Sequence, residues 1–265
     1  MSWLSRFGQP RSRLTGAPPS ANGASSFHLW WVLPSRGPFS EVTATLEIAR
    51  PPAVARLYFW ALQVSFVEAG REVGAGHTGL QWHPGAPGGA VNWGGYYSAE
   101  ARPAGGGPAG DGTLPGTSSV LPPVDGPHTR HFAWSAGRRY TLRVWSPASG
   151  RWRSEVTDTE SGEVTVIRDL LVDAGGLASP VVWSEVFARC DDPPTEARWS
   201  RLQTLEGPGQ VHTATAVNLT YQAYADGGCS NTETYADGDC FVQVTGLQAP
   251  RRPASDVLSL AASAL

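Results

Sequence analysis

Four residues in the middle of the chain have the types and the spacing of a binding surface. Arg143 and Trp145 alternate along one segment, and Arg153 and Glu155 alternate along the next. In an extended strand, residues two apart point to the same face, so each pair shares a face. Guanidinium groups form strong hydrogen bonds with acidic groups, and an indole presents a wide apolar ring. Alternatively, Arg153 and Glu155 form a surface ion pair, which contributes only about 0–1 kcal/mol and requires no function.

These residues fall within 139–172, a stretch that predicts three consecutive antiparallel strands. Tyr140, Leu142 and Val144 alternate with more polar residues, and turns that contain Gly150 and other turn formers separate the runs. Period-two alternation bounded by turn residues is typical of a sheet. One face of this predicted meander is apolar, and the other carries the four residues named above.

Composition indicates a β protein. The chain has 265 residues, of which 41% are hydrophobic and 16% charged, with 31 Gly, 22 Pro and 11 Trp. This length suits one large β domain or two small ones, and the many Gly and Pro favour turns over helices. About a dozen strand-like segments and no convincing helix predict an all-β fold, namely a two-sheet antiparallel jelly-roll sandwich.

The sequence predicts a single β-sandwich domain at 25–248. Residues 1–24 are rich in Ser, Pro, Gly and Arg, which predicts a disordered N-terminal segment. Residues 101–127 form a long Gly/Pro-rich loop, and because this loop has no aromatic residue, disorder is favoured over a functional role. Residues 249–265 are interpreted as a C-terminal tail.

The charge balance argues against two classes of partner. The net charge of −3 does not favour a nucleic-acid partner, since such binding is driven by basic side chains. No segment approaches the ~20 apolar residues of a membrane span. The start of the chain is basic but lacks the continuous apolar stretch of a standard signal peptide. All 20 basic residues are Arg, which indicates either biased codon use or Arg-specific recognition of carboxylates.

The three cysteines leave the pairing open. Cys229 and Cys240 flank a stretch rich in turn residues, which predicts a disulfide if the protein is exported. Cys190 would then be a free, buried thiol. The alternative is that Cys229 and Cys240 are ordinary thiols.

Acidic side chains near the C-terminal end could bind Ca²⁺, because carboxylate oxygens are its preferred ligands. Their spacing fits no EF-hand loop, so a solvated acidic turn is the competing interpretation, and we expect no other cofactor. The candidate ligands are Asp226, Glu233, Asp237 and Asp239.

The chain resembles the concanavalin A-like lectin/glucanase class of jelly rolls. The resemblance lies in the sequences YTLRVW at 140–145, GRW at 150–152 and VTDTESG at 156–162. The sequences GLQ at 79–81 and WSEV at 183–186 are also similar to a bacterial family of uncharacterised domains of that shape. Coverage would be roughly 26–248. These motifs specify a fold more than a chemistry.

The resemblance implies a concave sheet that binds a sugar. Aromatic rings would stack on the sugar rings, while Arg, Gln and carboxylate groups would bond hydroxyl or acidic groups. The residues expected on this face are Gln63, His77, Gln81, His83, Arg143, Trp145, Arg153, Glu155, Trp183 and Glu185.

Two catalytic alternatives follow from the same resemblance. The retaining glucanases of this fold carry Glu-x-Asp-x-x-Glu on one strand, but Glu155 and Asp158 are three residues apart and should point to opposite faces. Jelly-roll alginate lyases are similar at RSEV (153–156) and QVH (210–212). In that family an Arg and a Gln neutralise the uronate, and a His and a Tyr move the proton. Candidate catalytic residues would be Arg153, Glu155, Gln210, His212 and either Tyr221 or Tyr224.

The lyase resemblance is incomplete, because Thr157 and Asp158 stand where the family has a second Arg, and the family's Tyr-x-Lys motif is absent.

The leading hypothesis is a non-catalytic, monomeric, extracellular carbohydrate-binding sandwich. A polysaccharide lyase or other glycan-cleaving enzyme is the first alternative, and a structural or protein-interaction module is the second. The first two predict that Trp145 and Trp183 are open to ligand, whereas the third predicts that they are covered.

Overall fold

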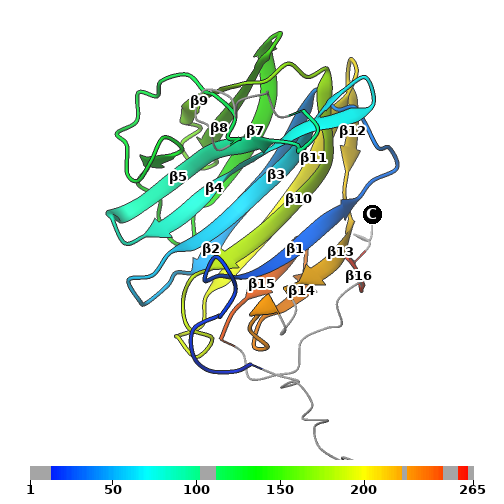
Figure 1. Cartoon of the computed structure of the whole chain (residues 1–265). Coiled ribbons are helices and arrows are strands. Elements are labelled where there is room, and N and C mark those ends of the chain that lie inside the picture. The colour runs from blue at the N-terminus through cyan, green and yellow to red at the C-terminus, as the bar shows by residue number, and fades with distance from the viewer. Residues whose placement is uncertain (1–12, 102–111, 223–225, 247–255, 262–265) are drawn as a thin grey trace, which may run out of the picture.

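The computed structural model describes residues 13–101, 112–222, 226–246 and 256–261. Every regular element in these ranges is a β-strand (Figure 1). The strands are β1 (Ser25–Val32), β2 (Glu41–Arg50), β3 (Tyr58–Glu68), β4 (Arg71–His83), β5 (Ala86–Tyr97), β6 (Thr129–His131), β7 (Arg139–Ala148), β8 (Arg151–Asp158), β9 (Val164–Leu171), β10 (Gly176–Val186), β11 (Glu196–Glu206), β12 (Gln210–Thr213), β13 (Ala216–Tyr221), β14 (Glu233–Asp237), β15 (Cys240–Val244) and β16 (Val257–Ser259).

The strands form two sheets that pack against each other (Figure 1). The first sheet has the order β16-β13-β1-β10-β3-β4-β5-β6, and the second has the order β14-β15-β11-β2-β7-β8-β9, with β12 beside β11. Neighbouring strands pair in the antiparallel sense. The predicted all-β, two-sheet antiparallel jelly-roll sandwich is therefore confirmed.

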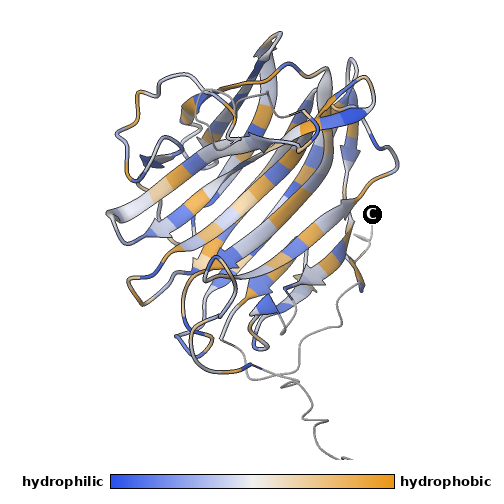
Figure 2. Ribbon diagram, in the orientation of Figure 1, coloured by the Kyte–Doolittle hydropathy of each residue, from blue (hydrophilic) through white to orange (hydrophobic). Residues whose placement is uncertain are grey.

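Alternation along each strand sends one face to the core and the other outward. In β3, Tyr58, Trp60 and Leu62 lie in the core between the sheets, whereas Phe59 and Ala61 belong to a small apolar cluster on the other face. Figure 2 shows this alternation of apolar and polar residues along the strands. Burying one large apolar side chain stabilises the fold by about 1.5–3 kcal/mol, so a shift of one residue in register would be costly.

The meander predicted at 139–172 is present as β7, β8 and β9, which are neighbours in the second sheet. Gly150 and Gly162 occupy the two turns with φ angles of 70° and 74°. Only Gly adopts such angles without strain, so these residues allow the tight connections.

The pairing of distant strands divides the expected binding face. β10 pairs with β3 in the first sheet, and β11 pairs with β2 in the second. The expectation of one shared face is wrong, because the ten residues lie on strands of two different sheets. On the first sheet are Gln63, His77, Gln81, His83, Trp183 and Glu185, and on the second are Arg143, Trp145, Arg153 and Glu155.

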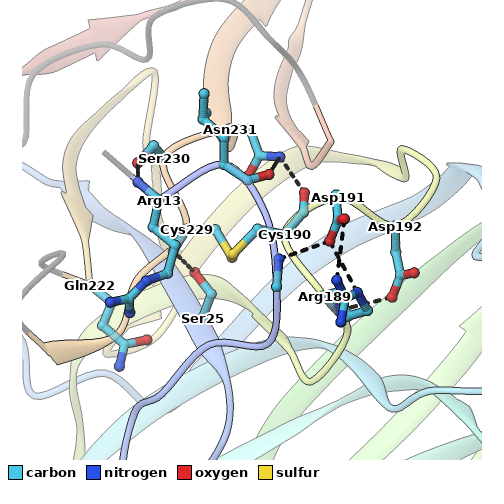
Figure 3. The surroundings of a disulfide bond; sticks show 12 residues. Arg13, Ser25, Arg189, Cys190, Asp191, Asp192, Gln222, Cys229, Ser230 and Asn231 are labelled. Atoms are coloured by element: carbon cyan, nitrogen blue, oxygen red, sulfur yellow. Dashed lines mark hydrogen bonds and ion pairs between the residues drawn. A yellow bond between two sulfur atoms is a disulfide. The ribbon is translucent and has the colours of Figure 1, made fainter. Parts of the chain in front are cut away.

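The predicted Cys229–Cys240 disulfide is also wrong. Cys190 and Cys229 form the disulfide, with a Cα–Cα distance of 5.5 Å (Figure 3), and Cys240 is free. Cys240 begins β15 and lies opposite Asp237 across the hairpin with β14. Cys229 instead lies beside β1, where its backbone N–H donates to Ser25 Oγ at 2.9 Å. Sequence spacing could not reveal this proximity.

The described part of the predicted N-terminal segment packs against the disulfide (Figure 3). The Cys190 N–H donates to the Gly16 carbonyl at 2.9 Å, and the Gly16 N–H donates to Asp191 Oδ1 at 2.9 Å. Arg13 and Ser230 are linked by a backbone hydrogen bond of 2.7 Å. These contacts give residues 13–16 a fixed path over the domain.

Two further segments have more structure than the sequence indicates. In the Gly/Pro-rich loop, Thr113 forms a bridge with Tyr96, and Gly116 forms one with Leu170. In the predicted tail, Val257–Ser259 is strand β16 at the edge of the first sheet. The domain boundaries themselves remain a prediction. Within the described ranges, no helix has the length and the apolar character needed to cross a bilayer.

Candidate functional site

Side chains on the outer face of the first sheet form a continuous series of ring contacts. Phe59 and Trp183 meet edge to face with centroids 5.1 Å apart, and His77 lies 5.9 Å from Phe59. His28 lies 5.9 Å from Trp183 on one side, and Tyr96 lies 5.8 Å from His77 on the other. We call this surface the aromatic–histidine face; it comprises His28, Trp30, Phe59, Gln63, His77, Gln81, Asn92, Tyr96, Trp183 and Glu185.

Strand register brings these side chains together from five neighbouring strands. Trp183 of β10 lies opposite His28 of β1 and Ala61 of β3. Gln63 of β3 lies opposite His77 of β4. The small Ala61 between larger neighbours lets the rings of adjacent strands approach one another.

The rings of this face differ in exposure. Trp183 is only 8% exposed, because Phe59 and His28 pack against it. Trp30 is 36% exposed and Tyr96 is 49% exposed, at the two sides of the face. Only these two rings offer a ligand an open aromatic surface. The expectation that Trp183 is open is therefore wrong.

Several buried polar atoms on this face have no hydrogen-bond partner within the described part of the chain. They are His77 Nδ1, Gln81 Oε1, Asn92 Oδ1 and Trp183 Nε1. They belong to a larger set of buried polar atoms without a partner in the described part of the chain, which also includes Arg143 Nε and Trp145 Nε1 of the second sheet.

Both histidines of the face are neutral at pH 7. Burial lowers the pKa of His28 to about 4. Burial, with a further effect from the charge of His128, lowers the pKa of His77 to about 4. A neutral imidazole offers one donor and one acceptor, which suits a hydroxyl group better than an anion.

Glu185 is the one acidic residue of the face. Its carboxylate accepts a hydrogen bond from Asn22 Nδ2 at 2.8 Å. Burial raises the pKa of Glu185, and the Asn22 bond partly offsets that effect. Burial and the charge of Glu185 together raise the pKa of the Tyr96 hydroxyl. Tyr96 is thus held in its neutral, donating form.

Sequence reasoning identified only part of this face. It predicted Gln63, His77, Gln81, Trp183 and Glu185, which the structure places there. His83 lies at the end of β4, where its Nε2 is 3.3 Å from Asp125 Oδ2. The residues missed are His28, Trp30, Phe59, Asn92 and Tyr96. The alternation in β1 was an available signal, because His28 and Trp30 are out of phase with the buried Phe27, Leu29 and Trp31.

The second sheet carries a different outer surface, which we call the arginine–tryptophan face: Glu41, Arg143, Trp145, Arg153, Glu155 and Asp169. Arg143 Nη1 donates to Glu155 at 2.8 Å, and its Nη2 donates to Glu41 at 2.5 Å. The Arg143 guanidinium also lies over the half-buried Trp145, 4.6 Å from the ring centroid. Arg143 therefore uses both its charge and its flat surface on neighbours in the protein.

Arg153 is engaged in the same way. It pairs with Asp169 at 2.8 Å rather than with Glu155, and it lies 5.9 Å from the Trp145 centroid on the same face. Arg151 adds a second, longer contact with Asp169 at 3.6 Å. Both guanidinium groups of this face, Arg143 and Arg153, are therefore paired to carboxylates rather than free for an acidic ligand.

The residues of the lyase interpretation are not brought together. His212 is paired with Glu206 at 2.7 Å and contacts Phe39. His212 of β12 lies opposite Thr204 of β11, and β2 and β7 lie between β11 and β8, the strand of Arg153. His212 and Arg153 are therefore four strand spacings apart, or roughly 19 Å.

The other lyase candidates are also distant from Arg153. Gln210 is exposed on β12, and Tyr221 belongs to β13 of the first sheet. Tyr224 lies outside the described residues.

The acidic candidates for Ca²⁺ do not form a site. Among the described residues, no group of three or more His, Cys, Asp or Glu side chains could hold a metal ion. Asp237 pairs with Arg198 at 3.0 Å, and Asp226 is exposed. Asp239 lines a largely apolar hollow of about 460 Å³ beside β11, away from the aromatic–histidine face.

Comparison with known proteins finds likeness to solved structures at low sequence identity. No family model and no curated protein matches the chain. Two solved peptidase structures resemble the protein, each over 83% of this chain and 97% of its own. One is SCP-B, an eqolisin-family peptidase with a bound tripeptide, at 10% identity and a TM-score of 0.43. The other is scytalido-glutamic peptidase with a peptide-based transition-state analog, at 11% identity and a TM-score of 0.44. Alginate lyase Aly36B resembles it over 90% of this chain and 88% of its own, with 10% identity and a TM-score of 0.29. These values are too low to transfer an activity.

Proposed function

We propose that the protein is a non-catalytic carbohydrate-binding sandwich that holds a neutral glycan on the aromatic–histidine face. The observation that carries the proposal is the pair of exposed rings, Trp30 and Tyr96, at the two sides of this face. We also propose that the chain belongs to the bacterial family of uncharacterised, concanavalin A-like domains that its sequence resembles.

The unpaired atoms match the chemistry of sugar hydroxyls. The Trp183 Nε1–H is a donor, Gln81 Oε1 and Asn92 Oδ1 are acceptors, and a neutral His77 nitrogen is one or the other according to its tautomer. A sugar hydroxyl both donates and accepts, so hydroxyls could serve these atoms once the side chains that cover them move aside.

Two exposed rings support the proposal. Trp30 and Tyr96 lie on β1 and β5, which are four strand spacings apart, or roughly 19 Å. An extended oligosaccharide could stack on both rings. This arrangement favours a polymer over a single sugar.

The charge of the face favours a neutral glycan over a uronate polymer. Both histidines are neutral at pH 7, and none of the ten residues of the face is Arg. On the opposite surface the arginines are paired with Glu41, Glu155 and Asp169. An acidic polymer would have to displace those carboxylates before it bound Arg143 or Arg153.

Affinity electrophoresis through gels that contain neutral or uronate polysaccharides tests this proposal. We expect at least one neutral polymer to retard the wild-type protein. The Trp30→Ala and Tyr96→Ala variants should migrate with little retardation, whereas Trp145→Ala, an equally drastic change on the other sheet, should behave as wild type. Loss of retardation in Trp145→Ala alone would place the site on the arginine–tryptophan face instead.

The polysaccharide that retards the protein also distinguishes a lectin from a glycan-cleaving enzyme and from an interaction module. New unsaturated or reducing ends in the retarding polymer would establish a glycan-cleaving enzyme rather than a lectin. No retardation by any polymer would favour a structural or protein-interaction module.

A further inference from the structure

A hollow of about 410 Å³, which we call the β1 hollow, opens where β1 ends. The buried rings of Trp31 and Phe39 line it. Three exposed polar residues, Arg36, Ser179 and Asn218, line it as well. Its volume falls in the range of about 300–1,000 Å³ that is usual for small-molecule sites. All of its lining residues belong to the described part of the chain, so the hollow is fully defined by them.

The β1 hollow exists because the pairing of β1 with β10 stops early. The last paired residues are Trp30 and Val181, and the next residue of β10 is Pro180, which has no N–H to donate to β1. β10 then bulges between Ala178 and Val181, and Ser179 in this bulge has a φ angle of 47°. Bulges and such angles in residues other than Gly are frequent at binding and active sites. The two strands therefore leave an opening between them.

Strand register places the β1 hollow at one end of the aromatic–histidine face. Asn218 of β13 lies opposite Trp30, and Val32 follows Trp30 by two residues, so all three share the outward face. β13 lies beyond β1 on the side away from β5, the strand of Tyr96. A glycan that runs from Tyr96 to Trp30 therefore meets the β1 hollow next.

The loop at 33–39 closes the β1 hollow beyond the strand ends. Phe39 and Leu177 of β10 exchange two backbone hydrogen bonds of 2.8 Å, which fix the end of the loop. Within the loop, the Gly37 N–H donates to Ser35 Oγ at 3.1 Å. Ser35 and Arg36 both line the hollow. The loop thus lies across the path of an extended chain that enters from Trp30, so the hollow accommodates the end of such a chain.

The polar groups of the β1 hollow suit sugar hydroxyls. Arg36 forms no ion pair with a described residue, so its guanidinium donors face solvent. The Asn218 amide and the Ser179 hydroxyl each donate and accept. Val32 is 41% exposed and adds apolar surface for the C–H groups of a sugar ring. The hollow therefore offers the mixed surface that one sugar unit requires.

We propose that the β1 hollow binds the terminal unit of the glycan, so that the protein recognises the end of a neutral polysaccharide chain rather than its interior. This inference rests on the proposed function, since the hollow continues the aromatic–histidine face at Trp30. It adds the feature of the ligand that the site selects, a free chain end.

Isothermal titration of the wild-type protein with purified fragments of glucan, mannan and xylan tests the proposal. Each polymer is supplied as short oligosaccharides and as chains several times longer than the distance between Trp30 and Tyr96. We expect one protein per chain at both lengths, because each chain offers one end of the kind that fits. Arg36→Gln and Asn218→Ala should each weaken binding about two- to tenfold, the effect of losing one hydrogen bond.

Arg56→Gln is the matched control. Arg56 is exposed and precedes β3, whereas β10 meets β3 near the hollow at Ser65, close to the other end of that strand. This variant should bind as wild type. Several proteins bound along each long chain would overturn end recognition and leave the glycan site standing, and so would unchanged affinity in both Arg36→Gln and Asn218→Ala. No binding of any fragment by the wild-type protein would overturn the proposed function and this inference with it.

Discussion

Removing the Cys190–Cys229 disulfide should greatly reduce stability. The bond joins residues 39 apart in the sequence. The chain-entropy relation for a loop of this length gives about 4 kcal/mol at 25 °C, since the cross-link restricts the unfolded chain. The Cys190→Ala/Cys229→Ala double variant should therefore lose about 4 kcal/mol of the free energy of unfolding.

Urea unfolding followed by tryptophan fluorescence measures this change. Cys240→Ala is the matched control, because Cys240 is a free, half-buried thiol, and it should lose no more than about 1 kcal/mol. The wild-type protein in reductant should unfold at the same midpoint as the double variant. A loss below about 1 kcal/mol in the double variant, or an equal loss in Cys240→Ala, would refute both the pairing and the entropic argument.

Three further predictions follow from the charges of single groups. The folded-state pKa of His28 and of His77 is about 4, below the ordinary 6.5, so the unfolded chain binds more protons between these values. The free energy of unfolding should thus fall as the pH is lowered from 6.5 to 4, by up to about 3 kcal/mol for each histidine. Urea titrations at several pH values measure this dependence, and the His77→Gln variant should show a weaker one. An unchanged pH profile in that variant would contradict the burial of His77. Arg143→Met should lower the free energy of unfolding by about 1–3 kcal/mol, because it leaves the buried Glu155 without its cation. The control Arg151→Met, at the exposed end of the same surface, should lower it by less than about 0.5 kcal/mol. Equal losses in urea unfolding would show that the ion pairs of Arg143 add no stability beyond that of an exposed pair. Burial raises the pKa of the Cys240 thiol to about 11. Because the thiolate is the reactive form, iodoacetamide at pH 7.5 should modify Cys240 much more slowly than free cysteine. Comparable rates of modification would contradict the burial of this thiol.

Local patterns were sufficient to predict the fold class. The alternation of Tyr140, Leu142 and Val144 and the turn glycines predicted the β7–β8–β9 meander, because period two and tight turns are properties of neighbouring residues. The same alternation correctly separated Leu80, in the core, from His77 on the outer face.

Long-range pairing could not be predicted in the same way. Nothing in the local sequence shows that β10 inserts beside β3, so residues of two sheets were assigned to one binding face. The disulfide was mispredicted for the same reason, since Cys190 and Cys229 meet only after β1, β10 and β13 have paired.

The central claim is that a neutral glycan binds the aromatic–histidine face through its two exposed rings, Trp30 and Tyr96. Its most direct test is nuclear magnetic resonance of the indole N–H groups of ¹⁵N-labelled protein, titrated with fragments of the polysaccharide that retards it. The account predicts that the Trp30 indole signal shifts on binding and that the Trp145 signal stays in place. A shift confined to Trp145, or no shift in any indole at saturating ligand, would contradict it.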